Sequence, residues 1–356
     1  MAVFCGLPTF PTDGEVAAVF GAEAVADCRA AGEAQARGFE VVCISRRTDP
    51  APSMGRFLRA LDRGYTFHIN PFRGRLIARG ALLPVNRAAL CYTPLSPTHV
   101  KVFSIYTKDL GALLTAFTCE PCLLLDYRWR VNYTVSGDSD RSILEPGVPK
   151  PLSARLVDLR ELCLKFAEFY PKTDINDLVQ VHYNPILAYR TAEGTVKNNG
   201  DHSRTLLAAL STNGLRHLHV GFYEGAPRWP ACDRQLGSFG LTPIRQTVAT
   251  KTSLLESLGL YPNTFGIEIQ SCADSDLIAA GVVSRGICLP YASLARLCPD
   301  IAPARGQKRK NGGSGCGCYP FRDVGSSFAV CAHDCAYCFA KKDHVRHAPA
   351  EIEDLI

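Results

Sequence analysis

The chain has 356 residues, of which 47% are hydrophobic and 21% charged, and its formal net charge is +5. These values are typical of a folded globular protein and exclude a disordered chain. No long apolar run predicts a membrane span, and so mild a charge does not by itself indicate a nucleic-acid partner.

The first residues have neither the basic start nor the apolar core of a secretory signal, and the early acids Asp13 and Glu15 argue against a transit peptide. We therefore expect the cytoplasm or another reducing compartment. There the 16 cysteines would be thiols or metal ligands rather than disulfides. Cys43, Cys91 and Cys163 lie in apolar segments and are interpreted as plain core residues.

Eight strand-like segments recur along the chain, each enriched in Val, Ile, Phe and Tyr. They cover residues 39–45, 65–70, 99–107, 122–134, 177–183, 215–223, 264–270 and 324–330. Between them, apolar residues recur at helical spacing in residues 54–61, 110–117, 159–170 and 204–210, and further helices are expected near 244–259 and 275–298. This alternation favours a (β/α)8 TIM-type barrel, closed or partly open, with a doubly wound open sheet as the alternative.

We expect the barrel over residues 39–340, after an N-terminal extension (1–38) with at most a short helix and before a tail (341–356). In such a barrel the functional groups lie on the loops that follow the strands. The first strand runs into SRRTD, and its two arginines and aspartate are typical of an anion-binding or ion-pair group.

The octet CAHDCAYC (331–338) follows the last predicted strand, and its cysteines Cys331, Cys335 and Cys338 are spaced C-x3-C-x2-C. Three thiolates can hold three irons of a [4Fe–4S] cluster and leave the fourth iron open. Zinc is the alternative, but structural zinc usually takes four protein ligands, commonly as two separated pairs. His333 is expected to be a solvent-facing loop residue rather than a fourth ligand.

This spacing resembles the signature of the radical S-adenosylmethionine (radical SAM) superfamily, in which Tyr337 takes the aromatic position before the last cysteine. The resemblance implies that S-adenosylmethionine chelates the open iron and is cleaved by an electron from the cluster. The resulting 5′-deoxyadenosyl radical would abstract a hydrogen atom from the substrate. It also implies an electron donor such as flavodoxin or ferredoxin.

Most of the chain further resembles a mostly bacterial family of unknown function, whose mark is a radical-SAM-like cysteine cluster at its C-terminus. The shared segments are ISRRTDPAP (44–52), INPF (69–72), LEPGVP (144–149), YNPIL (183–187), SCADSDL (271–277), GICLP (286–290), GQKRKNGGSGCGC (306–318) and DVGSSFAVCAHDCAYCFA (323–340). The family usually has Arg-Tyr-Asp-Pro where this chain has His182-Tyr183-Asn184-Pro185, so a shared substrate is not implied.

In typical radical SAM enzymes the cluster loop follows the first barrel strand, whereas here the equivalent strand comes last, as in a circularly permuted barrel. The SRRTD loop would then lie beside the cluster, where the superfamily holds the methionine end of its cosubstrate. The residues expected to bind the cofactor are therefore Arg46, Arg47, Asp49, Lys108 and Tyr337.

A second set of cysteines comprises Cys272, Cys288, Cys316 and Cys318. Four thiols from three segments could hold a structural zinc ion or a second, auxiliary iron–sulfur cluster. In the alternative interpretation, Cys272 and Cys288 are core residues and the Cys316–Cys318 pair is incidental.

The basic run at 305–310 is typical of a solvated loop, although it leaves a phosphate-bearing substrate open. We expect a radical SAM enzyme that acts on a small-molecule or phosphate-bearing substrate and has no membrane partner. One alternative is a non-enzymatic iron–sulfur or zinc-binding protein with a structural or electron-transfer role. A weaker one is a nucleic-acid repair or modification protein.

Overall fold

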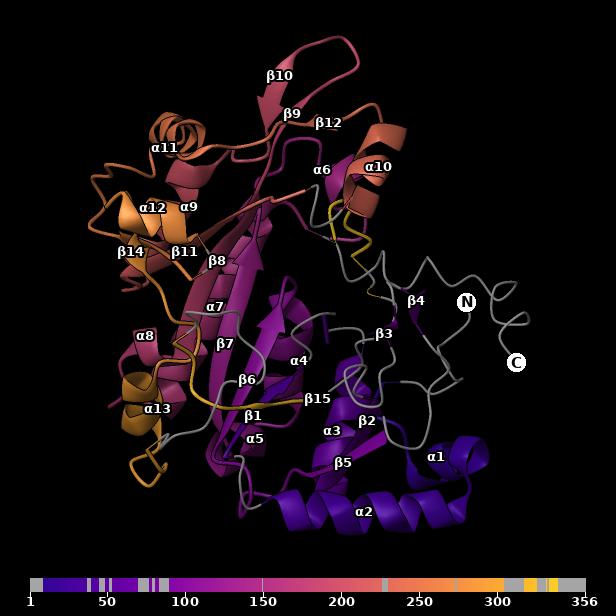
Figure 1. Ribbon diagram of the computed structural model, residues 1–356. Coiled ribbons are helices and arrows are strands. Elements are labelled where there is room, and N and C mark those ends of the chain that lie inside the picture. The colour runs from indigo at the N-terminus through magenta and orange to yellow at the C-terminus, as the bar shows by residue number, and fades with distance from the viewer. Residues whose placement is uncertain are drawn as a thin grey trace.

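The computed structural model describes residues 9–36, 40–44, 49–50, 53–69, 77–78, 81–82, 90–148, 150–225, 230–272, 274–303, 317–324, 331 and 333–338. Its largest sheet contains β1 (Val41–Ile44), β6 (Val102–Thr107), β7 (Arg128–Val135), β8 (Val179–Ile186), β11 (His217–Phe222), β13 (Glu268–Ser271), β14 (Ser284–Arg285) and β15 (Arg322–Val324). The strand order is β14-β13-β11-β8-β7-β6-β1-β15, and all neighbours are parallel (Figure 1). The expected α/β architecture with a parallel sheet is therefore confirmed.

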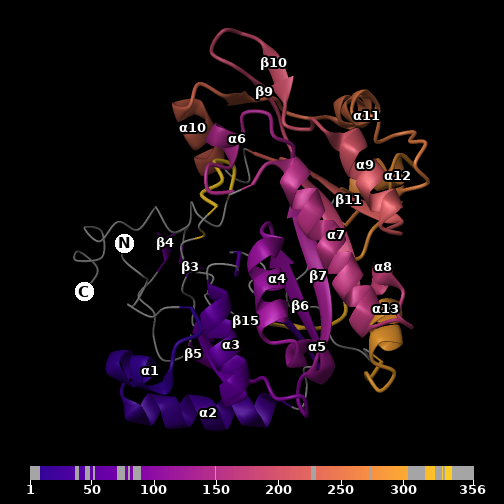
Figure 2. The same cartoon turned by 180° about the vertical axis from the view of Figure 1, so that it is seen from behind.

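Helices cover one face of this sheet, as the rear view in Figure 2 shows for α3, α4, α7 and α9. The helices between and after the sheet strands are α3 (Met54–Arg63), α4 (Leu110–Cys119), α5 (Cys122–Asp126), α7 (Leu152–Phe169), α8 (Ile175–Leu178), α9 (Ser203–Thr212), α11 (Val248–Ser257), α12 (Ser275–Ala279) and α13 (Tyr291–Leu297). Phe57 of α3 and Phe117 of α4 meet the ring of Trp129 edge-on, with centroids 6.3 and 5.1 Å away. Such aromatic contacts fix the helices against the sheet.

The two faces of the sheet differ in chemistry. In β7, Trp129, Val131, Tyr133 and Val135 point to the helical face and are fully buried. The alternate residues of the sheet point to the other face, and register places polar ones side by side: Ser104, Arg130, Asn132, Thr134, Gln180, His182 and His219. Parallel sheets are usually apolar on both faces, so a polar face is a distinctive feature of this one.

The second predicted strand is present, but the prediction that it belongs to the parallel sheet is wrong. β2 (Tyr65–Ile69) instead pairs antiparallel with β5 (Leu90–Pro94) in a separate two-stranded sheet. The reason is packing: Phe67, Ile69, Leu90 and Tyr92 form their own small core with Val16 of the N-terminal region. The connection from β1 to its neighbour β6 therefore carries this pair as an insertion.

Two other expectations about local structure need correction. Residues 1–38 were expected to hold at most a short helix, yet they include α1 (Asp13–Phe20) and the 15-residue α2 (Ala22–Ala36), which pack on β5 and on each other. The predicted strand at 122–134 begins as helix α5, because Leu123 and Leu124 bury themselves beside Trp129 before the strand starts. The predicted last strand at 324–330 lies mainly outside the described residues, and β15 ends at Val324.

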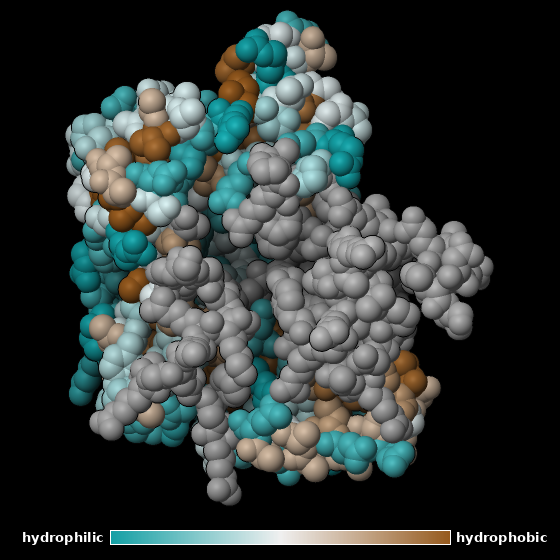
Figure 3. All heavy atoms as spheres, in the orientation of Figure 1, coloured by the Kyte–Doolittle hydropathy of each residue, from teal (hydrophilic) through white to brown (hydrophobic). Residues whose placement is uncertain are grey.

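The remaining elements lie around the sheet. They are α6 (Arg141–Leu144), α10 (Pro230–Ser238), β3 (Ile77–Ala78), β4 (Ala81–Leu82), β9 (Ala188–Arg190), β10 (Val196–Asn198) and β12 (Thr242–Pro243). Figure 3 shows hydrophilic and hydrophobic residues interspersed over the described part of one face. Within the described ranges, no helix is both long and apolar enough to cross a membrane.

Candidate functional site

The candidate site lies where the carboxyl ends of several parallel strands meet. Asp49 comes five residues after the end of β1, Lys108 directly follows β6, and Ser136 directly follows β7. The octet follows β15, which pairs with β1 in parallel register. The carboxyl ends of parallel strands share one edge of a sheet, where α/β proteins place their ligand and active sites. Asp49, the last residue of SRRTD, therefore lies at the same edge of the sheet as the octet, as expected.

The octet forms a compact double turn. The Asp334 amide donates to the Cys331 carbonyl (3.4 Å), and the Cys338 amide donates to the Cys335 carbonyl (3.1 Å). Cys335 is buried, Cys331 and Cys338 are half-buried, and all three are free thiols. Burial raises the pKa of both Cys331 and Cys335, while the Lys108 ammonium opposes the rise at Cys335. These thiols would have to lose their protons to bind a metal.

His333 is buried rather than solvent-facing, which corrects the expectation from the sequence. Its side chain is only 4% exposed, and its Nε2 lies 2.6 Å from Asp49 Oδ2. Its Nδ1 lies 3.2 Å from the carbonyl oxygen of Gly147. Both neighbouring atoms are acceptors, so both ring nitrogens are placed to donate, an arrangement that favours the imidazolium form. Burial alone would lower the pKa of His333, but the Asp49 carboxylate outweighs it and raises that pKa.

Asp49 is itself held firmly in place. The Thr107 hydroxyl donates to its carboxylate oxygens at 2.9 and 3.0 Å, and the backbone amide of Lys108 donates to Oδ2 at 2.5 Å. Asp49 thus ties the end of β6 to the octet through His333. Because both nitrogens of His333 are engaged in this arrangement, the ring does not offer a fourth metal ligand.

A second buried ion pair holds Tyr337. Lys108 Nζ pairs with Glu145 and lies 2.9 Å from the Tyr337 hydroxyl, which donates to the same carboxylate. The Ser136 hydroxyl donates to the other oxygen of Glu145 at 2.5 Å. Burial by itself would lower the pKa of Lys108, but the Glu145 carboxylate outweighs this effect and raises it. Burial likewise opposes ionisation of Glu145, and Lys108 reverses that, so its pKa is lowered.

The loop that contains Glu145 also binds the octet through its backbone. The Ala336 amide donates to the Leu144 carbonyl at 2.9 Å, and the Gly147 amide donates to the His333 carbonyl at 3.0 Å. Sequence reasoning did not select Glu145 as a site residue. The available signal was its place in LEPGVP, one of the segments shared with the resembling family.

The residues predicted to bind the cofactor fall into two groups. Asp49, Lys108 and Tyr337 meet the octet as described above, whereas Arg46 and Arg47 lie outside the described residues. Lys108 has its charge balanced by Glu145 inside the protein, so a role in binding the carboxylate of a cosubstrate stays a prediction.

The second cysteine set lies elsewhere on the sheet, and Cys316 is outside the described residues. Cys272 is exposed, which rules out the core interpretation for this residue, and its Sγ is 3.8 Å from that of the buried Cys288. The Cys288 carbonyl accepts a hydrogen bond from Arg130, near the beginning of β7.

In the described part of the chain, no group of three or more His, Cys, Asp or Glu side chains is already arranged to hold a metal ion. Cys43, Cys91 and Cys163 are buried, as expected of core residues.

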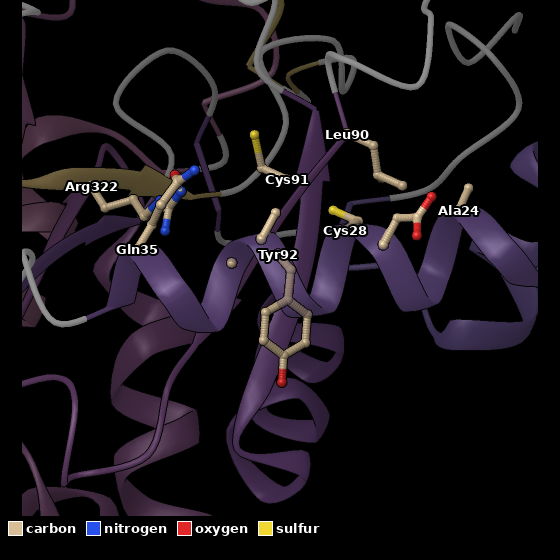
Figure 4. Close-up of a pocket in the computed structure, with 10 residues that line it drawn as sticks. Ala24, Cys28, Gln35, Leu90, Cys91, Tyr92 and Arg322 are labelled. Carbon is tan, nitrogen blue, oxygen red and sulfur yellow. Dashed lines mark hydrogen bonds between the residues drawn. The ribbon is translucent and has the colours of Figure 1, made fainter.

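A cavity of about 210 Å³ lies between α2 and β5, and Arg322 of β15 also lines it. Figure 4 shows the Cys28 and Cys91 side chains and the contact between Gln35 and Arg322 around it. Arg322 Nη2 donates to Gln35 Oε1 at 3.3 Å. None of the predicted site residues lines this cavity.

Comparison with known proteins gives one match. The family model described as a domain of unknown function, DUF1848, matches residues 41–340. No curated protein and no solved structure matches the chain. The matched span takes in the parallel sheet, the LEPGVP loop and the octet. The chain therefore belongs to the family defined by this domain of unknown function, DUF1848.

Proposed function

We propose that the octet binds a [4Fe–4S] cluster through Cys331, Cys335 and Cys338, and that the protein is a radical SAM-type enzyme. The observation that carries this proposal is a three-thiol loop fastened to the carboxyl edge of a parallel sheet by two buried ion pairs, Asp49–His333 and Lys108–Glu145. Such fastening keeps the octet at this edge of the sheet, and its three thiols would still have to turn toward the cluster, because they are not arranged around one metal ion here.

The donor set fits this cluster. The three cysteines are free, and the thiolate is the normal ligand of an iron–sulfur cluster. Since both nitrogens of His333 are engaged with Asp49 and Gly147, the octet supplies three ligands rather than four. With S-adenosylmethionine bound and one electron from a donor such as flavodoxin or ferredoxin, such a cluster would supply a 5′-deoxyadenosyl radical, with methionine as the other product.

The polar face of the sheet supports an open barrel whose interior takes a polar substrate. Asn132, Gln180 and His219 are buried on this face, on the side away from the helices that cover the sheet in Figure 2. In a doubly wound fold, by contrast, helices would cover both faces and both would be apolar. A barrel interior can remain polar where it encloses a ligand. The substrate would enter at the octet's edge of the sheet.

The chain's own residues have distinct roles in this proposal. Asp49 and Glu145 hold the octet through His333 and Tyr337, and Ser136 fixes the second oxygen of Glu145. The two ion pairs cancel internally and leave no free positive charge to pair with the carboxylate of S-adenosylmethionine. Arg46 and Arg47 therefore remain the expected partners of its carboxylate.

Anaerobic reconstitution tests the proposal. The wild-type protein should bind four irons per chain through the octet, and its reduced cluster should change its electron paramagnetic resonance spectrum on addition of S-adenosylmethionine. With a reductant it should release 5′-deoxyadenosine. Cys335→Ala should lose this iron, whereas the exposed control Cys119→Ala should keep it. Wild-type iron content in Cys335→Ala would falsify the assignment.

A second candidate is a non-enzymatic iron–sulfur protein that transfers electrons or stabilises the fold. The observation that favours it is the internal neutralisation of Lys108, which removes one candidate cation for cosubstrate binding. Both candidates predict a cluster, but only the enzyme responds to S-adenosylmethionine. An intact, reducible cluster with an unchanged spectrum and no 5′-deoxyadenosine would select the second candidate.

A further inference from the structure

Two thiols of the second cysteine set are already in contact. Cys272 directly follows β13 and Cys288 lies shortly after β14, and these two strands pair through Ser271 and Arg285. The Gly286 amide extends the pairing by donating to the Ser271 carbonyl at 2.8 Å. The two Sγ atoms are 3.8 Å apart, far beyond the length of about 2.05 Å for a disulfide bond, so both are thiols.

The backbone brings a third thiol, Cys318, alongside Cys288. The Tyr319 amide donates to the Leu289 carbonyl at 2.7 Å, which sets residues 317–319 beside residues 287–289. A Cβ atom on Gly317 would lie only 2.7 Å from Cδ1 of Ile287, which shows how closely the two segments approach. Contacts with the Cys272 and Cys318 thiols, together with burial, hold the pKa of Cys288 well above its usual range.

We propose that Cys272, Cys288 and Cys318 are ligands of one structural zinc ion, distinct from the cluster of the octet. In a tetrahedral site with zinc–sulfur bonds of about 2.3 Å, two sulfurs lie about 3.8 Å apart. The Cys272–Cys288 separation of 3.8 Å equals that edge. In a [4Fe–4S] cluster each thiolate binds a different iron, which spreads the sulfurs further apart. The observed distance therefore favours a single ion over an auxiliary [4Fe–4S] cluster.

Binding would still require a small closure. The described residues do not yet surround one point with three donors, so Cys318 must turn toward the Cys272–Cys288 pair. A fourth donor then completes the tetrahedron. The thiols must also lose their protons, and a cation among them would offset the repulsion between the resulting thiolates.

The position of this site indicates a structural role. Residues 287–289 lie across the polar face near the amino ends of the strands, where Arg130 Nε donates to the Cys288 carbonyl at 3.1 Å and Gln180 Nε2 to the Ile287 carbonyl at 3.3 Å. Cys318 precedes β15 at one edge of the sheet, while Cys288 follows β14 at the other. In Figure 1 the chain leading into β15 crosses in front of β6. The zinc ion would link the segment that precedes β15 to the segments that follow β13 and β14, at the two ends of the strand order.

Metal analysis of the full-length protein separates this site from the octet. Protein expressed with zinc and iron should contain one zinc per chain, measured by mass spectrometry of the metals. Cys331→Ser/Cys335→Ser/Cys338→Ser should lose iron and keep zinc, whereas Cys272→Ser and Cys288→Ser should lose zinc and keep iron. Cys119→Ser is the matched exposed control and should keep both. Failure of the octet to bind iron would not affect the zinc result.

Cobalt provides a readout that does not depend on the folding of a variant. One equivalent of Co²⁺ added to reduced, zinc-depleted wild-type protein should produce thiolate-to-cobalt absorption and the strong visible bands of a tetrahedral ion. Zinc should then abolish these bands. Wild-type protein with no zinc and no such bands, or full zinc content in Cys288→Ser, would overturn the inference. So would iron in place of zinc at these thiols.

Discussion

Replacing Glu145 by glutamine tests the buried ion pair that holds Tyr337. The substitution keeps the shape of the side chain but removes the charge that balances Lys108. Glu145 is 2% exposed and Lys108 14% exposed, so the remaining ammonium would have little access to water. Removing one partner of a buried ion pair typically costs about 3–5 kcal/mol. Since whole domains are stable by only about 5–15 kcal/mol, we expect a large fall in the free energy of unfolding.

The assay is urea unfolding of the reduced, iron-free protein, followed by the fluorescence of the buried Trp129. The double variant Lys108→Met/Glu145→Gln removes both charges and should recover much of the loss, because no buried charge is left unpaired. Glu161→Gln, an exposed position on α7, is the matched control. A loss below about 1 kcal/mol in Glu145→Gln, or a double variant whose loss equals the sum of the single losses, contradicts our account of this ion pair.

Two further predictions concern stability away from the octet. Gly32→Ala should destabilise the packing of α2 on β5 by roughly 1–3 kcal/mol, because a Cβ there would lie 2.6 Å from both Cδ1 and the carbonyl oxygen of Tyr92. Gly14→Ala, where nothing lies within 4 Å, should leave the melting temperature unchanged or raise it, and equal melting temperatures for the two variants would disprove the close packing. Burial, and then the nearby charges of His182 and Arg130, lower the pKa of His219 to about 2. Below about pH 6.5 the unfolded chain therefore binds a proton that the folded protein does not, so stability should fall with decreasing pH by about 1.4 kcal/mol per unit. Urea midpoints at pH 7.5 and 5.5 should show a smaller drop in His219→Gln, and identical drops would mean that this histidine is charged in the folded protein.

Local patterns in the sequence were sufficient to predict most of the strands, whereas the cluster chemistry of the octet stays a prediction. Alternating apolar residues such as Trp129, Val131 and Tyr133 mark a strand because period-2 spacing buries one face of it. The thiol spacing of the octet depends on neighbouring residues alone. The resemblance to radical SAM enzymes, taken as a circularly permuted barrel, also implied that the last strand lies beside the first, and β15 pairs with β1.

Long-range packing accounts for what could not be predicted. β2 reads as an ordinary strand, and only its contacts with Tyr92 and Val16 place it outside the parallel sheet. In the sequence, His333 looks like a polar loop residue. In the structure it is buried because Asp49, 284 residues away in the chain, accepts a hydrogen bond from its Nε2. Glu145 is likewise a site residue only because it contacts Lys108 and Tyr337. Cys272 is a candidate ligand because its thiol lies beside that of Cys288. A local pattern indicates which chemistry a residue supports. The partner of that residue depends on which strand ends lie at the same edge of the sheet.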